Sequence, residues 1–179
     1  MAEQTIADPE RLTYERAREL FGRAYELLNQ RDPAQIAAIF TEDVVFEDDA
    51  WPETVNGHAG MTRFLTTLWR AFPDFRFELV AGPYLTEDGS GASVRARTTG
   101  TMTGPFDPPG FAPTGTRMTT EYGGFYEFEG DRIRRARIVV NMNDSASQLG
   151  AAPKPGSRGE RLVVMMQRLQ ARRMRKRGA

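Results

Sequence analysis

The residues best suited to chemistry lie where a strand-like run, Arg134–Val140, ends in Asn141. A Gly130-Asp131 turn followed by branched side chains predicts a strand for this run. Because alternate strand residues share a face, Arg137 and Asn141 should lie together, and we expect both to point into a cavity. The opposite face, expected to be core or interface, holds Arg134, Ala136, Ile138 and Val140.

A second group of candidates comes from other parts of the chain. Asp48 lies in an acidic loop behind the strand-like Val44-Val45-Phe46, and a carboxylate there can accept a proton if burial raises its pKa. It could equally be a solvated loop charge. An aromatic-walled cavity with a few polar groups suits a flat small molecule. The residues expected to form its wall are Tyr25, Trp51, Trp69, Met102, Phe106 and Tyr122. Trp69 on a helical stripe and Phe106 in a proline-rich loop also fit a plain core role.

Hydrophobic periodicity predicts the elements that must position these residues. Asp8-Pro9, a cap residue followed by a proline, predicts the start of a long first helix, and apolar residues recur at helical spacing from Ala17 to Leu28. A short helix is predicted after Asp32-Pro33 and a third over Gly57–Phe72. Strand-like runs follow near Phe75–Leu85, Ala92–Thr103, Met118–Phe128 and Ile133–Val140. This order predicts an α+β fold with a curved, mostly antiparallel β-sheet, whose three N-terminal helices close a pocket.

Composition narrows the function classes. The 179 residues fit one domain with tails, and they include no cysteine and one histidine, which argues against disulfides and against a zinc or non-haem iron site. The chain begins without a signal peptide and has no apolar run of membrane-spanning length, so we expect a cytoplasmic protein. Equal numbers of basic and acidic residues give no general attraction to nucleic acid.

The C-terminal segment has a different character. Eight basic residues crowd residues 158–177, where Glu160 is the one acidic residue. An apolar stripe through Leu162, Met165, Met166 and Leu169 predicts a basic amphipathic helix. We expect this helix to dock on its own sheet or on a partner subunit, and we expect neither a membrane nor a nucleic acid as partner. The chain therefore divides into a tail over residues 1–12, a domain over residues 13–150, and a linker with this helix over residues 151–179.

Three segments together resemble the SnoaL-like polyketide cyclases of the nuclear transport factor 2 superfamily. They are Phe72–Glu78, Gly100–Phe106 and the final strand-like run with the residues that follow it. The resemblance spans roughly Tyr14 to Gly150. It implies a cone-shaped α+β domain, a homodimer through the sheet, and chemistry without metal or cofactor.

The resemblance also implies a reaction, an intramolecular aldol closure in which a carboxylate removes a proton beside a carbonyl. The family's usual aspartate at the end of the last strand is Asn141 here, and its frequent histidine is Met102. Asn141 and Arg137 would then polarise the carbonyl. The base would be Asp144, three residues on, or failing that Asp48 or His58. Alternatively, Asp144 caps a terminal turn.

The sequence therefore favours a small-molecule pocket protein, with cofactor-independent polyketide (ester) cyclase activity as the first hypothesis. Its ligand would be a hydrophobic or aromatic polyketide-like molecule. The alternative is a non-catalytic binding or accessory protein that kept the cavity and lost the base. Epoxide hydrolysis is disfavoured, because Ile138 and Asn141 stand where limonene epoxide hydrolase carries aspartates.

Overall fold

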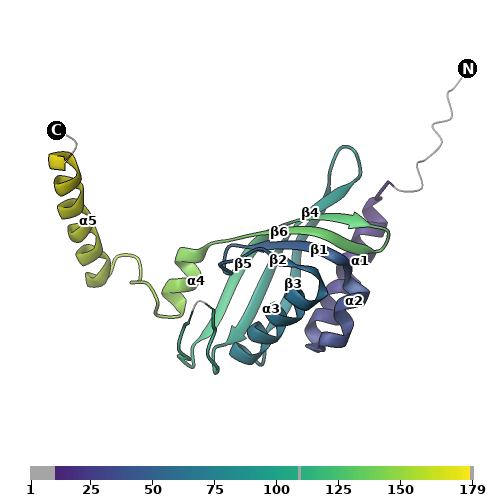
Figure 1. Cartoon of the computed structure of the whole chain (residues 1–179), viewed down its shortest axis with the longest axis horizontal. Coiled ribbons are helices and arrows are strands. Elements are labelled where there is room, and N and C mark those ends of the chain that lie inside the picture. Colours follow the sequence, from purple (N-terminus) through teal and green to yellow (C-terminus); the bar gives the residue numbers. More distant parts are fainter. Residues whose placement is uncertain (1–10, 109, 178–179) are drawn as a thin grey trace, which may run out of the picture.

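A computed structural model describes residues 11–108 and 110–177 and has the predicted α+β architecture (Figure 1). The tail predicted over residues 1–12 lies, except for its last two residues, outside the described part, and so does the helix start predicted at Asp8-Pro9. Residues 11–13 are not helical. The helices are α1 (Tyr14–Gln30), the 3₁₀ turn η1 (Pro33–Gln35), α2 (Ile36–Ile39), α3 (Gly57–Ala71), α4 (Met142–Gln148) and α5 (Arg158–Arg177). The strands are β1 (Phe40–Asp48), β2 (Val55–Asn56), β3 (Arg76–Leu85), β4 (Gly91–Thr101), β5 (Arg117–Glu129) and β6 (Arg132–Val140).

Local signals explain where the first helices begin. The Thr13 hydroxyl accepts a hydrogen bond from the Arg16 N–H at 3.2 Å and caps α1. Asp32 does the same for η1, accepting from the Ala34 N–H at 2.9 Å, with Pro33 at the first helical position. The predicted stripe of α1 is buried, since Ala17 and Phe21 are at most 1% exposed. These helices therefore pack along one apolar face, as their periodicity predicts.

One six-stranded sheet, in the order β2-β1-β6-β5-β4-β3, forms the frame of the domain. Every pairing is antiparallel except that of β1 with β6, which is parallel. Helices α1 and α3 pack against the sheet, and they cover the face on which the core lies (Figure 1). The predicted fold class is confirmed.

The apolar face of β6 lies against the core, as expected, but it also lines the cavity, which we assigned to the opposite face. Ala136 and Ile138 are buried at 0% and 6% exposure and face the core, whereas the side chain of Arg137 is 43% exposed on the outer side. The prediction that Arg137 and Asn141 point into the cavity is therefore wrong. The reason is energetic: the core side of the sheet is apolar, and an unpaired guanidinium there would lose its hydration.

The end of β6 also differs from the extended continuation we expected. Asn141 leaves the strand and becomes the N-cap of α4, where its side-chain oxygen accepts from the Asp144 N–H at 3.1 Å. Asn141 is exposed, and so is Asp144. The sequence predicted a capped turn in this region as one alternative, but with a different residue as the cap.

Helix α5 stands away from the rest of the chain at the end of a linker (Figure 1). Its apolar side chains are exposed, Leu162 by 53% and Met166 by 54%, so the prediction that it docks on its own sheet is wrong. Docking on a partner subunit stays a prediction. Among the described helices, none is both long enough and apolar enough to cross a lipid bilayer.

Candidate functional site

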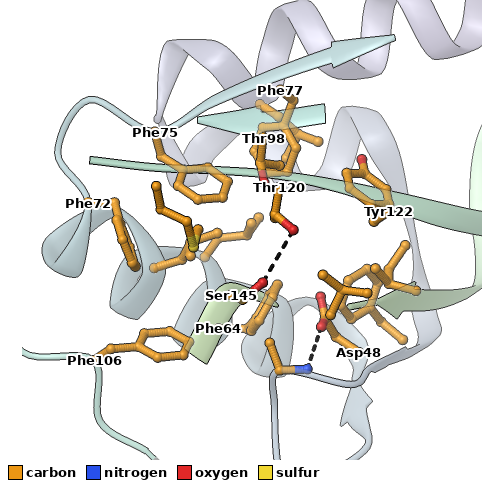
Figure 2. Close-up of a pocket in the computed structure, with 18 of the residues that line it drawn as sticks. Asp48, Phe64, Phe72, Phe75, Phe77, Thr98, Phe106, Thr120, Tyr122 and Ser145 are labelled. Carbon is orange, nitrogen blue, oxygen red and sulfur yellow. Dashed lines mark hydrogen bonds between the residues drawn. The ribbon is translucent and has the colours of Figure 1, made fainter. Parts of the chain in front are cut away.

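A cavity of about 150 Å³ lies between the concave face of the sheet and helices α1, α3 and α4 (Figure 2). Phenylalanines from α3, β3 and the loops around them gather at one end. Those labelled in Figure 2 are Phe64, Phe72, Phe75, Phe77 and Phe106. A concave, mostly apolar wall that is rich in aromatic side chains and has a few polar groups is typical of small-molecule sites.

Three tyrosines supply hydroxyl groups to this wall. The phenol oxygens of Tyr25 on α1 and Tyr122 on β5 are hydrogen-bonded at 3.0 Å. Tyr126 lies four residues further along β5 on the same face, close enough for Tyr25 and Tyr122 to influence its pKa. Burial raises the pKa of Tyr25 and raises those of Tyr122 and Tyr126 well above the usual value. The three phenols therefore stay protonated at neutral pH and can donate hydrogen bonds.

A glycine gives the Tyr126 ring its position. Gly124 precedes Tyr126 by two residues on the same face, and a Cβ there would lie 2.5 Å from the Tyr126 hydroxyl. Real Cβ atoms do not approach other atoms so closely. The ring therefore lies over the backbone of Gly124 and could not keep this place above any other residue.

Among the described residues, Asp48 at the end of β1 is the one carboxylate in the cavity wall. The Ala50 N–H donates to its Oδ1 at 2.8 Å, and Oδ2 has no hydrogen bond to any residue that the structure describes. The pKa of Asp48 is raised from 3.8 to about 6: burial is the main cause and Asp49 adds to the rise, while the Ala50 N–H and Arg137 oppose it. Asp48 also raises the pKa of Tyr126, so carboxylate and phenols share one electrostatic environment.

Helix α4 brings a third set of polar groups to the cavity. The Ser145 hydroxyl donates to the Thr120 hydroxyl on β5 at 3.2 Å, as Figure 2 shows, and both residues line the cavity. The Gln148 side chain fastens the same helix to β5, accepting from the Thr119 N–H and donating to the Thr119 carbonyl oxygen. Helix α4 therefore forms one wall of the cavity.

Four of the predicted site residues meet in the cavity: Asp48, Tyr25, Tyr122 and Phe106. They come from α1, β1, β5 and the loop after β4. None is adjacent to another in sequence, so their meeting is a product of the fold. Of the candidate bases, Asp48 alone lines the cavity.

The other proposed catalytic residues lie elsewhere. Arg137 pairs with Asp49 on the outer face, and Asn141 caps α4. The Asp144 carboxylate is exposed and accepts a hydrogen bond from the Gln148 side chain at 2.7 Å. His58 contacts the Phe40 carbonyl oxygen through Nε2 at 3.0 Å. None of these four residues lines the cavity, so their placement does not support the predicted roles in contact with a ligand.

Trp51, Trp69 and Met102 are core residues and do not line the cavity. Trp51 packs its indole against Phe64, with ring centroids 5.1 Å apart and an angle of 83° between the planes. Met102 is fully buried. The expectation that these three contact a ligand is therefore wrong. Trp69 follows the alternative that its helical stripe allowed.

Sequence reasoning missed Tyr126, Thr98, Thr120 and Ser145 as cavity residues. A signal for two of them, Thr120 and Tyr126, was present. Thr120, Tyr122, Gly124 and Tyr126 alternate along β5, so once Tyr122 is placed inside, period-two spacing places Thr120 and Tyr126 beside it. No comparable signal marked Ser145, because α4 was not predicted.

Metal ligands do not gather at this site. Within residues 11–108 and 110–177, no three His, Cys, Asp or Glu side chains come together in a way that could hold a metal ion. The polar groups of the cavity are a carboxylate, phenols and hydroxyls. This set can accept and donate protons.

Comparisons with known proteins agree with this fold. Residues 21–136 match the SnoaL-like domain family. No curated protein matches the chain. The fold resembles that of a protein from Jannaschia sp. CCS1 described as a SnoaL-like polyketide cyclase, with a TM-score of 0.65, 17% identity, and coverage of 82% of this chain and 97% of that one.

Two further solved structures are similar. AclR from Streptomyces galilaeus, described as a hydroxylase, has a TM-score of 0.65 and 20% identity, and the match covers 93% of this chain and 98% of AclR. A protein from Pseudomonas putida KT2440 described as a polyketide cyclase has a TM-score of 0.62 and 24% identity, and the match covers 73% of this chain and 95% of that one. At these identities the likeness shows the fold alone. The family match extends over more than half of the sequence, and the chain therefore belongs to the SnoaL-like domain family.

Proposed function

We propose that the protein is a cofactor-independent cyclase for an uncharged, aromatic, polyketide-like ketone or ester, with Asp48 as its base. One observation carries the proposal. The carboxylate of Asp48 faces an aromatic cavity, with one oxygen free of protein partners and a pKa raised to about 6. At neutral pH such a group is mostly ionised, yet it is basic enough to take a proton from carbon.

The tyrosines supply the complementary group. Removal of a proton beside a carbonyl places negative charge on the carbonyl oxygen. A phenol that stays protonated can donate to that oxygen, and well-aimed donors of this kind lower a barrier by about 3 kcal/mol. Tyr122 is the donor we favour, because it lines the same cavity as Asp48 and burial keeps its phenol protonated. Either hydroxyl can donate in its hydrogen bond with Tyr25, and when Tyr25 donates, the proton of Tyr122 is free for the ligand.

The ring closure follows from these two parts. Asp48 takes the proton as the C–H bond breaks, and the electron pair forms the enolate. The enolate carbon then bonds to a second carbonyl carbon of the same molecule. The oxygen formed there receives the proton back from Asp48, so the reaction is an isomerisation and needs no oxidant or reductant.

The cavity restricts the substrate. Its volume of about 150 Å³ is on the scale of a benzene-sized ligand in an apolar protein core. Its lining holds no lysine, arginine or histidine to pair with an anionic ligand. We therefore expect a neutral molecule with one or two rings, held at the phenylalanine end with its carbonyl toward Asp48.

Deuterium exchange into 2-tetralone, a neutral bicyclic ketone with acidic C–H bonds, tests the proposal without knowledge of the natural substrate. The protein should accelerate exchange in D₂O, and Asp48→Asn should reduce that rate by about 100-fold or more. Asp144→Asn, which changes an exposed carboxylate outside the cavity, is the matched control and should exchange like the parent. Exchange that is unchanged in Asp48→Asn would eliminate Asp48 as the base. Tight binding of 2-tetralone with no exchange in the parent would instead indicate a binding protein.

A further inference from the structure

An ion pair on the outer face of the sheet lies directly behind Asp48. Asp49 follows Asp48 in the turn after β1, and it does not line the cavity. There the Arg137 guanidinium forms an ion pair with Asp49 Oδ1. The Val140 N–H donates to Asp49 Oδ2 at 3.3 Å.

The same residues join the end of β1 to β6 through the backbone. The Asp49 N–H and Arg137 Nη1 both donate to the Ile138 carbonyl oxygen, at 3.4 Å and 3.1 Å. The side chains of Ile138 and Val140 line the cavity beside Asp48. The contacts of Asp49 and Arg137 therefore hold the backbone of the part of the cavity wall that contains Asp48.

We propose that Asp49 and Arg137 are positioning residues for Asp48. They hold the end of β1 against β6 so that the Asp48 carboxylate faces inward, and they place two opposite charges behind it. The inference deepens the proposed function and rests on it for any effect on turnover. Its effect on Asp48 itself can be measured separately.

The charges act on Asp48 in opposite directions. Burial dominates its raised pKa, Asp49 adds to the rise, and Arg137 opposes it. The other ionisable groups that face Asp48 across the cavity are Tyr25 from α1 and Tyr122 and Tyr126 from β5. These phenols stay neutral near pH 6, so the charged groups that shift the Asp48 pKa are the two members of the outer pair.

The chain contains its own matched control. Glu47 on β1 and Arg135 on β6 form a second ion pair diagonally across the same two strands, with 3.9 Å between Arg135 Nη2 and Glu47 Oε2. Arg135 lies two residues before Arg137 on β6, and neither control residue is hydrogen-bonded by its side chain to the β1 or β6 backbone in the described structure. Changes in this second pair remove the same charges from the same two strands without touching the cluster behind Asp48.

The test is the pKa of Asp48 in the full-length protein, measured by carboxyl ¹³C NMR titration. Arg137→Gln should raise it and Asp49→Asn should lower it, each by roughly half a pH unit or more. Arg137→Lys keeps the charge but cannot reach both Asp49 and Ile138, so it should lie between Arg137→Gln and the parent. Glu47→Gln and Arg135→Gln should leave the value within about 0.2 of the parent, because neither Glu47 nor Arg135 is among the causes of the Asp48 shift.

The opposite signs separate this role from a merely structural one. If the pair only stabilised the fold, both variants would expose Asp48 to water and shift its pKa the same way. Equal shifts in both variants, or shifts as large in the control pair, would overturn the inference. The midpoint of the pH profile for exchange into 2-tetralone should move with the measured pKa. If exchange proves independent of Asp48 while the NMR shifts persist, the proposed function fails and the positioning role stands.

Discussion

The phenol oxygens of Tyr25 and Tyr122 lie 3.0 Å apart and connect helix α1 to strand β5 across 97 residues of sequence. Both residues are only 7% exposed. A hydrogen bond in such surroundings matters mainly through what its loss leaves behind, because a buried hydroxyl without a partner keeps the full cost of its lost hydration.

Tyr25→Phe should therefore lower the free energy of unfolding by about 1–2 kcal/mol. Urea denaturation would measure the loss. Tyr14→Phe is the control: Tyr14 is on the same helix and 46% exposed, and its change should cost less than about 0.5 kcal/mol. In a double-mutant cycle, Tyr25→Phe and Tyr122→Phe should show a coupling of about 1 kcal/mol. Strict additivity would mean that the two hydroxyls are not bonded in solution.

Two adjacent glycines of β5 should respond differently to the same substitution. A Cβ at Gly124 would overlap the Tyr126 ring, whereas a Cβ at Gly123 would meet only the edge of Phe125, at 4.0 Å, on the outer face. Gly124→Ala should lose about 1–3 kcal/mol of stability, as overpacked cores do, together with affinity for 2-tetralone. Gly123→Ala should be neutral or slightly stabilising. Equal tolerance of both changes would contradict the placement of Tyr126.

Much of this arrangement could be predicted from sequence. The stripe through Phe21 and the period-two patterns of β4, β5 and β6 depend on local preference and on burial of apolar surface, and both can be read along the chain. Composition and the family resemblance led to the correct fold class. Four cavity residues followed from the same reasoning.

The same rules could not predict which face of the last strand, β6, lines the cavity. Alternation separates Arg137 from Ile138 correctly, but it does not say which side faces the cavity. We assigned the polar side to the ligand, while the structure places the apolar side there and pairs Arg137 with Asp49, 88 residues away. A pairing over that distance depends on the parallel contact of β1 with β6, which no local pattern records.

The free energy of unfolding should depend on pH because Asp48 has different pKa values in the folded and unfolded chain. Its pKa is about 6 in the folded chain and 3.8 as a reference for the unfolded chain. The folded protein therefore binds this proton more tightly. Protonated Asp48 contributes about 3 kcal/mol to the free energy of unfolding below about pH 4. This contribution is lost as the pH rises through 6.

Asp48→Asn removes that dependence, because an amide stays neutral. Its stability relative to the parent should thus increase by about 2 kcal/mol between roughly pH 4.5 and pH 8, by urea denaturation at each pH. Asp43→Asn, on an exposed residue of the same strand, should show little change in this difference. A parallel response of the two variants would mean that Asp48 is solvated.

Helix α5 should contribute little to the stability of the domain before it. Its large apolar side chains are 43–73% exposed. The C-terminal end of α4 is capped without α5, since the Ala151 N–H donates to the Ala146 carbonyl oxygen at 2.8 Å. Removal of residues 153–179 should change the Tm of a dilute sample by no more than about 2 °C, measured by circular dichroism. If α5 docks on a partner subunit, as we propose, the Tm of the full chain should rise with protein concentration while that of the shortened chain stays constant. A large fall in Tm at low concentration would show instead that α5 packs on its own domain.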